Sequence, residues 1–467
     1  MKGHRGPRRA HWSAFAVLVA FALFAAACGR IASPQGWAGP TLSPDGKTVY
    51  ATIERGKIAA LDANMAPETG AQCDNNVDDD GDGYVNEGCP QAGQKSEQGA
   101  QCLNNTNDDL NNGVPDDNLV NDGCPAIIVH WVFPPNTDEG NKLKLEGIYG
   151  APIRVGDVVY VGAYDGNVYA LDAAAGTPLW RFETGDAIVS SMASKDGTLF
   201  VTSTDGRLYA LDAATGTERG RFETNSSIWA SPTVVGDVVY VAAMDGKLYA
   251  LDAATLTPVS DFSFKTDAGL LMDPTLAASG TLLVGGIDHK LYALDPKTGK
   301  QLWSKPFEGG NWFWAKPLVN GDTAYLADLN GNVYAVNLKD GTPRWNKPFQ
   351  TSDSVRAAPL LAGGTLVVVD RSGNAYGLKT EDGSRQWGPT LLGKTVLSDP
   401  FLLQTTSASP TPAPSESPAA SPSPSPAATG AAGGAEVLIV AQGGDLCRLN
   451  PADGSPTGAV LCSQVQT

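Results

Sequence analysis

A repeat of about 42 residues dominates the sequence and limits the folds open to the chain. Its clearest copies are VVYVGAYDGNVYALDAAAGTPLW (158–180), LFVTSTDGRLYALDAATGTERG (199–220) and VVYVAAMDGKLYALDAATLTP (238–258). The residue after the YAL-type core recurs in steps of 40, 40, 43, 42 and 42 residues, at Asp172, Asp212, Asp252, Asp295, Asn337 and Lys379. A fixed period of this length indicates a repeat architecture and not several unrelated domains.

Two further copies of the repeat are interrupted. VYATIERGKIAALDA (49–63) places Asp62 in the same role, 110 residues before Asp172, and VLIVAQGGDLCRLNPADG (437–454) places Asn450 there, 71 residues after Lys379. Subtracting one repeat from each gap leaves insertions of roughly 70 and 30 residues. The chain therefore holds eight repeats.

Each repeat contains four strand-length segments separated by turn residues. The VVYV and VYALD segments are apolar with little alternation, as in strands buried on both faces, and DG and TG pairs follow them as turns. Four short strands in about 40 residues are typical of one propeller blade. We predict an all-β fold, an eight-bladed β-propeller of four-stranded antiparallel blades.

A tryptophan motif makes the resemblance specific. The pattern A-x-D-x-x-x-G-x-x-x-W spans Ala170–Trp180, Ala293–Trp303, Ala335–Trp345 and, with Gly first, Gly377–Trp387. It resembles the repeat of the quinoprotein (PQQ-like) propellers, a family that includes non-enzymatic BamB-like outer-membrane assembly lipoproteins. The resemblance covers about residues 36–404 and 435–462, apart from the first insertion, and implies that each Trp docks on the next blade. The repeats at 210–220 and 250–260 lack the Trp, so we expect the docking there to be weaker or differently made.

The repeat register places both insertions inside blades. Residues 64–126 replace the turn between the third and fourth strands of blade one. Residues 405–434 fall between the first two strands of blade eight, and their Pro/Ser/Ala-rich composition predicts a disordered loop.

The first insertion is acidic and internally duplicated. Residues 64–126 hold 13 acids and one Lys, against a net charge of −17 for the whole chain. Each copy is bracketed by cysteines, which predicts disulfides Cys73–Cys89 and Cys102–Cys124. Because the acidity is confined to this loop, it says nothing about the partners of the propeller, and no nucleic-acid ligand is expected.

The first copy has the oxygen-ligand spacing of a calcium loop. Alternate acids followed by Gly resemble the first half of an EF-hand and thrombospondin-type calcium repeats. The expected ligands are Asp78, Asp80, Asp82, the Tyr84 carbonyl, Asn86 and Glu87. The register is ambiguous, since position twelve is Cys89 counted from Asp78 and Glu87 counted from Asn76. The second copy is degraded, and its candidate ligands are Asp108, Asp109, Asn112, Asp116 and Asp117. The alternative is a disulfide-closed acidic loop without metal.

The N-terminus predicts export. Four cations precede an uncharged apolar run from Ala14 to Ala27, too short to span a bilayer as a helix. The run ends at Cys28 in a sequence that resembles a lipoprotein cleavage box, with Ala25 in place of the usual Leu. We expect a signal peptide at 1–27, a lipid on Cys28, and a single propeller domain at 28–467, on the outer face of the cell membrane or in the outer membrane. Ordinary cleavage after Ala27 is the alternative.

The last cysteine pair flanks the final hairpin. Cys447 and Cys462 fall nearly opposite each other around the turn at Asp453-Gly454, which predicts a cross-strand disulfide in the blade that completes the ring. We also expect the ring to close without strand exchange, since the first repeat begins with its own first strand.

Catalysis is poorly supported by the residue types present. Beyond residue 27 the chain has two histidines, His130 and His289, and both are expected to be structural. The quinone-dependent dehydrogenases of the resembled family carry adjacent cysteines near PQQ, and this chain has no such pair. PQQ is therefore not an expected cofactor. We predict a non-catalytic scaffold, a monomeric propeller that binds protein partners of the envelope; a dehydrogenase or a small-ligand sensor is the alternative.

Blade-specific residues before the first strand of each repeat are the candidates for binding. They vary on a constant scaffold, where function can differ between blades. Those that could rim a funnel on one face are Trp229, Asp273, Trp312, Trp314, Lys316, Arg356 and Asp399. The alternative is that the aromatic members fill space between blades.

Overall fold

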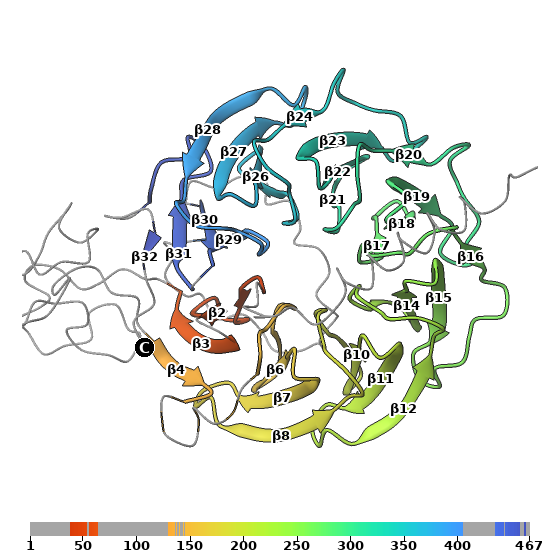
Figure 1. The fold of residues 1–467 in the computed structure, drawn as a ribbon, viewed down its shortest axis with the longest axis vertical. Coiled ribbons are helices and arrows are strands. Elements are labelled where there is room, and N and C mark those ends of the chain that lie inside the picture. Colours follow the sequence, from red (N-terminus) through yellow and green to blue (C-terminus); the bar gives the residue numbers. More distant parts are fainter. Residues whose placement is uncertain are drawn as a thin grey trace, which may run out of the picture. The chain divides into compact units, whose positions relative to one another are not determined.

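Each repeat forms one four-stranded antiparallel sheet, and the eight sheets follow one another around a ring (Figure 1). The computed structural model describes residues 38–53, 56–63, 129–135, 137, 140, 143, 145–404, 435–442, 444–457 and 462–463. The chain divides into units of residues 1–34 and 35–467, and every described residue belongs to the second. Within these residues there is no helix long and apolar enough to cross a membrane. The predicted eight-bladed propeller is confirmed.

The blades use the strands in chain order, and we name the four strands of each blade A to D from the first to the last. The bounds are β1 (Thr41–Leu42), β2 (Thr48–Ile53), β3 (Lys57–Asp62), β4 (Val129–Phe133); β5 (Ile153–Val155), β6 (Val158–Gly162), β7 (Asn167–Asp172), β8 (Pro178–Glu183); β9 (Ala193–Lys195), β10 (Thr198–Thr202), β11 (Arg207–Asp212), β12 (Glu218–Glu223); β13 (Thr233–Val235), β14 (Val238–Ala242), β15 (Lys247–Asp252), β16 (Phe264–Lys265); β17 (Thr275–Leu276), β18 (Leu282–Gly285), β19 (Lys290–Leu294), β20 (Phe307–Glu308); β21 (Leu318–Asn320), β22 (Thr323–Ala327), β23 (Asn332–Asn337), β24 (Phe349–Gln350); β25 (Leu360–Ala362), β26 (Thr365–Val369), β27 (Asn374–Lys379), β28 (Arg385–Leu391); β29 (Phe401–Gln404), β30 (Ala435–Val440), β31 (Leu446–Leu449) and β32 (Cys462–Ser463).

The turn chemistry explains where the strands stop. In blade two, Asp165 Oδ1 accepts the Asn167 N–H at 2.9 Å and closes the B–C turn. Asp172 Oδ1 accepts the N–H groups of Ala174 and Ala175 in the C–D turn, at 3.0 and 2.8 Å. Gly176 completes that turn at φ +66°, a backbone conformation that glycine adopts without steric cost. Strands B and C between these turns are buried almost throughout, as their apolar sequences predict.

A tryptophan on strand D, or in the segment just before it, joins most blades to the next. Trp180 Nε1 donates to the Ala213 carbonyl at 3.0 Å, and its ring lies over Gly216, where a Cβ would come within 2.5 Å of ring carbon. The same bond is made by Trp131 to Ala173, Trp303 to Leu338, Trp345 to Thr380 and Trp387 to Pro451. The predicted docking role of Trp180, Trp303, Trp345 and Trp387 is confirmed.

The two junctions without the motif Trp are packed differently. Gly220 stands at the Trp position of blade three, and the facing glycine of blade four is replaced by Leu256, whose Cδ1 lies 3.8 Å from where a Gly220 Cβ would be. Between blades four and five, Phe262 packs against Tyr240 with ring centroids 5.7 Å apart, and Tyr240 Oη donates to the Pro296 carbonyl at 2.6 Å. The expectation of a different contact at these junctions is confirmed.

The ring closes where blade eight meets blade one. The two blades lie beside each other in Figure 1. One apolar cluster joins Val49, Ala51 and Leu61 of blade one to Leu438 and Val440 of blade eight. Every described strand of blade one comes from the N-terminal part of unit 35–467 and every described strand of blade eight from its C-terminal part. Among the described strands the ring therefore closes by side-chain packing, and none is exchanged between the two blades.

Antiparallel order gives the ring two faces. The A–B and C–D turns lie at one end of each sheet, which we call the A–B face, and the B–C turns and the D-to-A connections lie at the other, which we call the B–C face. β3 ends at Asp62 and β4 begins at Val129, and β29 ends at Gln404 and β30 begins at Ala435. Both long breaks therefore open on the A–B face, in neighbouring blades. The residues within them lie outside the described part.

Candidate binding site at the propeller axis

The D-to-A connections bring blade-specific side chains to the axis of the ring. Strand A is the innermost strand of each blade, as β21 is in blade six, and the connection reaches it on the B–C face (Figure 1). In the connections the residue just before the proline that leads into strand A, or before Met192 in blade three, occupies an inner ring. Its members are Gly39, Ala151, Ser191, Ser231, Asp273, Lys316, Ala358 and Asp399, which we call the pre-strand ring.

Hydrogen bonds join neighbouring members of the pre-strand ring. The backbone N–H of one member donates to the side chain of the next: Ala151 to Ser191 Oγ at 2.9 Å, and Ser191 to Ser231 Oγ at 3.0 Å. Ser231 donates to Asp273 Oδ1 at 2.6 Å, and Ala358 donates to Asp399 Oδ1 at 2.7 Å. These side chains therefore hold adjacent blades together at the axis, a role that the sequence analysis did not foresee for Asp273 and Asp399.

An aromatic and cationic cluster lies beside this ring. The rings of Trp229 and Trp314 meet at 71° with their centroids 6.4 Å apart, and the Arg356 guanidinium carbon lies 5.1 Å from the centroid of the Trp314 ring. Trp229 precedes β13 of blade four, Trp314 precedes β21 of blade six, and Arg356 precedes β25 of blade seven. The two tryptophans thus meet across the position of blade five, and all three side chains are half-buried. Stacking a guanidinium on Trp stabilises the pair by about 0.5–2 kcal/mol.

Charges near the axis are perturbed by burial. Burial raises the pKa of the Asp273 carboxyl, and the nearby Asp399 acts in the same direction, while Lys316 and the hydrogen bond from Ser231 oppose the shift. Burial lowers the pKa of the Arg356 guanidinium, reinforced by the positive charge of Arg371. The Arg356 Nε is buried and has no hydrogen-bond partner in the described part of the chain.

The remaining axial candidates lie at the B–C face. Lys316 is exposed. Trp312 is half-buried, and its carbonyl accepts the N–H of Leu329 in the B–C turn of the same blade at 3.2 Å. The structure therefore brings Trp229, Trp314 and Arg356 into contact and places Asp273, Lys316 and Asp399 on one ring. Partner binding by these residues stays a prediction.

A comparison with known protein families identifies the family of this propeller. A family model described as "Outer membrane protein assembly factor BamB" matches residues 164–259 and 257–413, more than half of the chain. The chain belongs to the PQQ-like β-propeller repeat family.

Two solved structures share the fold of this PQQ-like propeller. BamB from Moraxella catarrhalis matches with 18% identity and a TM-score of 0.51, over 68% of this chain and 84% of that one. The computationally designed Ika8 protein matches with 12% identity and a TM-score of 0.57, over 88% and 95% of the two chains. At such identities the likeness concerns the fold alone. No curated protein matches the chain.

Hydrogen bonds between Asp and Tyr in the B–C turns form a second set of contacts in the PQQ-like propeller, which we did not predict from the sequence. In four blades the B–C turn Asp accepts the hydroxyl of a Tyr four residues on, as Asp205 does from Tyr209 at 2.5 Å. Asp205 Oδ2 also accepts the Gly185 N–H from the preceding D-to-A connection at 2.8 Å. The spacing D-G-x-x-Y in the repeat could have revealed this bond. It holds the B–C face together and leaves the variable residues before strand A free to differ.

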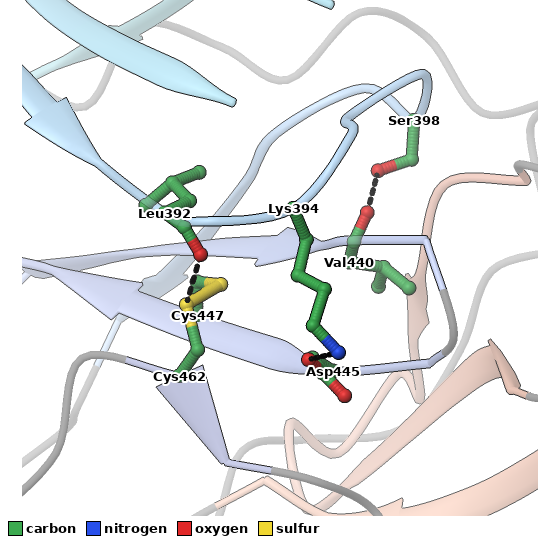
Figure 2. The surroundings of a disulfide bond; sticks show 7 residues. All are labelled: Leu392, Lys394, Ser398, Val440, Asp445, Cys447 and Cys462. Atoms are coloured by element: carbon green, nitrogen blue, oxygen red, sulfur yellow. Dashed lines mark hydrogen bonds and ion pairs between the residues drawn. A yellow bond between two sulfur atoms is a disulfide. The ribbon is translucent and has the colours of Figure 1, made fainter. Parts of the chain in front are cut away.

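The predicted disulfide of the last blade is confirmed. Cys447 on β31 and Cys462 on β32 are directly paired and bonded, with their Cα atoms 3.9 Å apart (Figure 2). Cys462 Sγ lies 3.6 Å from the Leu392 carbonyl oxygen of blade seven; because a bonded sulfur carries no hydrogen, we regard this as a packing contact. Lys394 and Asp445 form an ion pair at 3.0 Å across the same junction.

The other sequence candidates lie outside the described residues. They are Cys28, the cysteines Cys73, Cys89, Cys102 and Cys124, and all proposed metal ligands of both copies in the acidic insertion. Of the two histidines, His289 adopts φ +66° in its B–C turn, and its carbonyl accepts the Gly309 N–H at 2.8 Å. His130 lies on β4.

Proposed function

We propose that this chain is a non-catalytic scaffold of the cell envelope that binds other proteins through the B–C face of its propeller. The observation that carries the proposal is the match of residues 164–413 to a family model whose description is an outer-membrane assembly factor. Propeller interiors are packed cores, so recognition falls to the loops that vary between blades. On the B–C face those loops carry Trp229, Trp314, Lys316 and Arg356.

The composition of this face supports protein recognition. Tryptophan and arginine are the side chains most enriched in the energetic centres of protein interfaces. Here they form a single cluster, half-buried and held in place by ring and cation–π contacts. A surface that is rigid before binding loses less conformational entropy when a partner docks.

Site-specific photo-crosslinking tests the scaffold proposal. A crosslinking residue at Asp267, in the D-to-A connection before blade five, reports on the B–C face; one at Lys297, in the C–D turn of the same blade, reports on the opposite face. Both positions are exposed. We expect discrete adducts with envelope proteins in cells from position 267 and none from position 297. Equal labelling from both positions, or none from either, contradicts the proposal.

We propose further that a lipid on Cys28 anchors the protein. The apolar run to Ala27 and the cysteine that follows support this proposal. Substituting Cys28→Ser should abolish incorporation of radiolabelled palmitate and move the protein from the membrane fraction to the soluble fraction. Retention of the label on the variant contradicts the anchor.

Calcium binding by the acidic insertion is a separate proposal. The closely spaced carboxylates of Asp78, Asp80 and Asp82 repel one another without a cation, and oxygen-only ligands suit calcium. Calcium should protect residues 70–125 of the full chain from proteolysis, and the triple substitution of these acids by Asn should remove the protection. Protection that is equal in calcium and in a chelator contradicts the metal site.

A quinone-dependent dehydrogenase remains the second candidate, favoured by the docking motif that this chain shares with such enzymes. Those enzymes reduce artificial dyes when loaded with PQQ. Dye reduction by purified protein after incubation with PQQ and a divalent cation decides between the two, and we expect none. A small-ligand sensor is the third candidate, tested by the titrations described below.

A further inference from the structure

The hydrogen-bonded pre-strand ring lacks acceptors in the sector of blades five to seven. Asp273, Lys316 and Ala358 occupy consecutive positions there. At the four hydrogen-bonded junctions the N–H of one member donates to the side chain of the next, and by that pattern the Asp273 N–H would donate to the side chain at 316 and the Lys316 N–H to the side chain at 358. Lysine and alanine side chains have no acceptor. In the part of the chain that the structure describes, neither N–H has a hydrogen-bond partner. Gly39 and Ala151 likewise offer no side-chain acceptor to the members before them, but no cation stands at those positions of the ring.

Cations replace the acceptors in this sector. The exposed Lys316 ammonium belongs to it, and the Arg356 guanidinium, two residues before Ala358, forms no ion pair among the described residues. Burial lowers the pKa of Arg356, the positive charge of Arg371 in the adjoining B–C turn acts in the same direction, and the Asp353 carboxylate acts against it without forming an ion pair. One oxygen of the Asp273 carboxylate accepts the Ser231 N–H from the preceding blade, and the Lys316 charge is close enough to act on the pKa of this carboxyl. The sector therefore combines two backbone donors without hydrogen-bond partners among the described residues with the positive charges of Lys316, Arg356 and Arg371.

Neighbouring sectors show which group satisfies such donors. At blades four to five and seven to eight the acceptor is a carboxylate oxygen, 2.6 Å from the Ser231 nitrogen and 2.7 Å from the Ala358 nitrogen. Carboxylates accept from backbone N–H groups and pair with guanidinium in charge-assisted hydrogen bonds, about twice as strong as neutral ones.

We propose that the sector of Asp273, Lys316 and Arg356 is a binding site for a carboxylate supplied by a ligand. The ligand carboxylate takes the place that Asp273 and Asp399 fill elsewhere in the ring, accepting from the Lys316 N–H and pairing with Lys316 and Arg356. Trp314 holds the guanidinium by its face and leaves the guanidinium edge for the ligand. The carboxylate belongs either to an acidic side chain of a partner protein or to a small organic acid, so the proposal does not depend on the scaffold role.

Calorimetric titration of the full chain tests the site. The ligands are glutarate and a blocked pentapeptide of alternating glycine and glutamate, each compared with its amide counterpart, glutaramide and the glutamine peptide. We expect both carboxylates to bind and neither amide to do so. A peptide at least tenfold tighter than glutarate assigns the carboxylate to a protein partner, and the opposite order assigns it to a small acid.

Three variants locate the binding. Arg356→Gln should weaken the carboxylate ligand about tenfold or more, because one charge-assisted bond is lost. Arg385→Gln removes the same charge from an exposed position on β28, the outer strand of the same blade, and should leave affinity unchanged. Ala358→Asp supplies an internal carboxylate to the Lys316 N–H, as Asp399 does for Ala358, and should abolish ligand binding without lowering the melting temperature.

Several results overturn the proposal. They are the absence of binding by both carboxylates, equal binding by the amides, and equal loss in the Arg356→Gln and Arg385→Gln variants. Undiminished binding by a folded Ala358→Asp variant also overturns it. Failure here leaves the crosslinking result at position 267 standing, so the two proposals fail separately.

Discussion

At each of five blade junctions a glycine, which has no Cβ, leaves room for a tryptophan to dock. The facing glycines are Gly176, Gly216, Gly341, Gly383 and Gly454, and at each one a Cβ would lie 2.3–2.7 Å from the ring of the docked Trp. All five also adopt a positive φ that closes the C–D turn. The repeat motif therefore requires glycine for two reasons, a left-handed backbone and a flat surface for the indole.

Two glycines of blade six separate these reasons. Gly341 has φ +77°, and a Cβ at this position would lie 2.7 Å from the Trp303 ring, whereas Gly321 has φ +57° with open space around it. Gly321→Ala should lower the unfolding free energy by about 1 kcal/mol, because alanine is strained in a left-handed backbone conformation. Gly341→Ala should cost about 2–4 kcal/mol, because the indole must also move. Denaturant unfolding measures both, and equal losses would contradict the docking account.

The carboxyl of Asp212 predicts a pH dependence. Its pKa is lowered to about 2 by the hydrogen bond from Arg219 and by bonds from Thr215. A lowered folded-state pKa stabilises the protein above the unfolded pKa, near 4, and this contribution is lost as pH falls toward 2. The loss in unfolding free energy caused by Asp212→Asn should thus be larger at pH 6 than at pH 2. Asp261→Asn, at an exposed carboxyl without an ion pair in the described residues, should show no such difference.

At the scale of the element, neighbouring blades pack through a large side chain on one blade and a small residue on the other, and either blade can supply the large one. Most junctions place a Trp on strand D, or just before it, opposite a Gly in the next C–D turn. Between blades three and four the sizes are reversed, with Gly220 on strand D and Leu256 in the turn at φ +55°. The large side chain has moved from one partner to the other, 36 residues away in the sequence. A large apolar side chain from one partner still packs against a glycine of the other, although neither residue fits the motif.

A reciprocal exchange tests this account. Gly220→Trp alone should overpack the junction and cost about 1–3 kcal/mol, and Leu256→Gly alone should leave a cavity that costs about 2–4 kcal/mol. The double substitution recreates the docking pair of the other blades and should be more stable than either single variant. The measurement is a double-mutant cycle by denaturant unfolding. Additive losses would show that the two side chains do not share one space.

The last strand of the ring depends on its disulfide. β32 has two residues, paired with Leu446 and Cys447 of β31. The bridge closes a segment with a sequence separation of 15, for which the chain-entropy estimate is about 3 kcal/mol. Replacing both Cys447 and Cys462 by Ala should lower stability by about that amount and raise amide hydrogen exchange in blade eight before the other blades. Unchanged exchange there would mean that packing alone holds β32.

For the whole molecule, the seam between blades eight and one differs from every other junction. The C–D turn of blade one, which would present the docking glycine, is interrupted after Ala63. Among the described residues the seam is formed by the apolar cluster around Val49, Leu61 and Leu438. The same interruption carries 13 of the acids of the chain and opens on the A–B face, away from the axial cluster.

The insertion should be separable from the ring. Replacing residues 64–127 with Ala-Ala-Gly restores the eight-residue spacing from Asp62 to Trp131 that blade two has between Asp172 and Trp180. We expect this variant to keep the far-ultraviolet circular dichroism and monomeric elution of the parent, with a melting temperature at least as high. Aggregation or loss of the β signal would show that the ring needs the insertion.

The sequence by itself determined the eight blades, the four strands in each, the places where two of them are interrupted, the docking tryptophans and the last disulfide. These features are encoded within one repeat or within a short separation, where hydrogen-bonded turns and strand periodicity act locally. Only the tertiary structure decided which side chains meet at the axis. Trp229, Trp314 and Arg356 come from three blades, and the Gly220–Leu256 exchange and the seam also join distant segments. The curvature of the closed ring sets those encounters, and no local pattern records it.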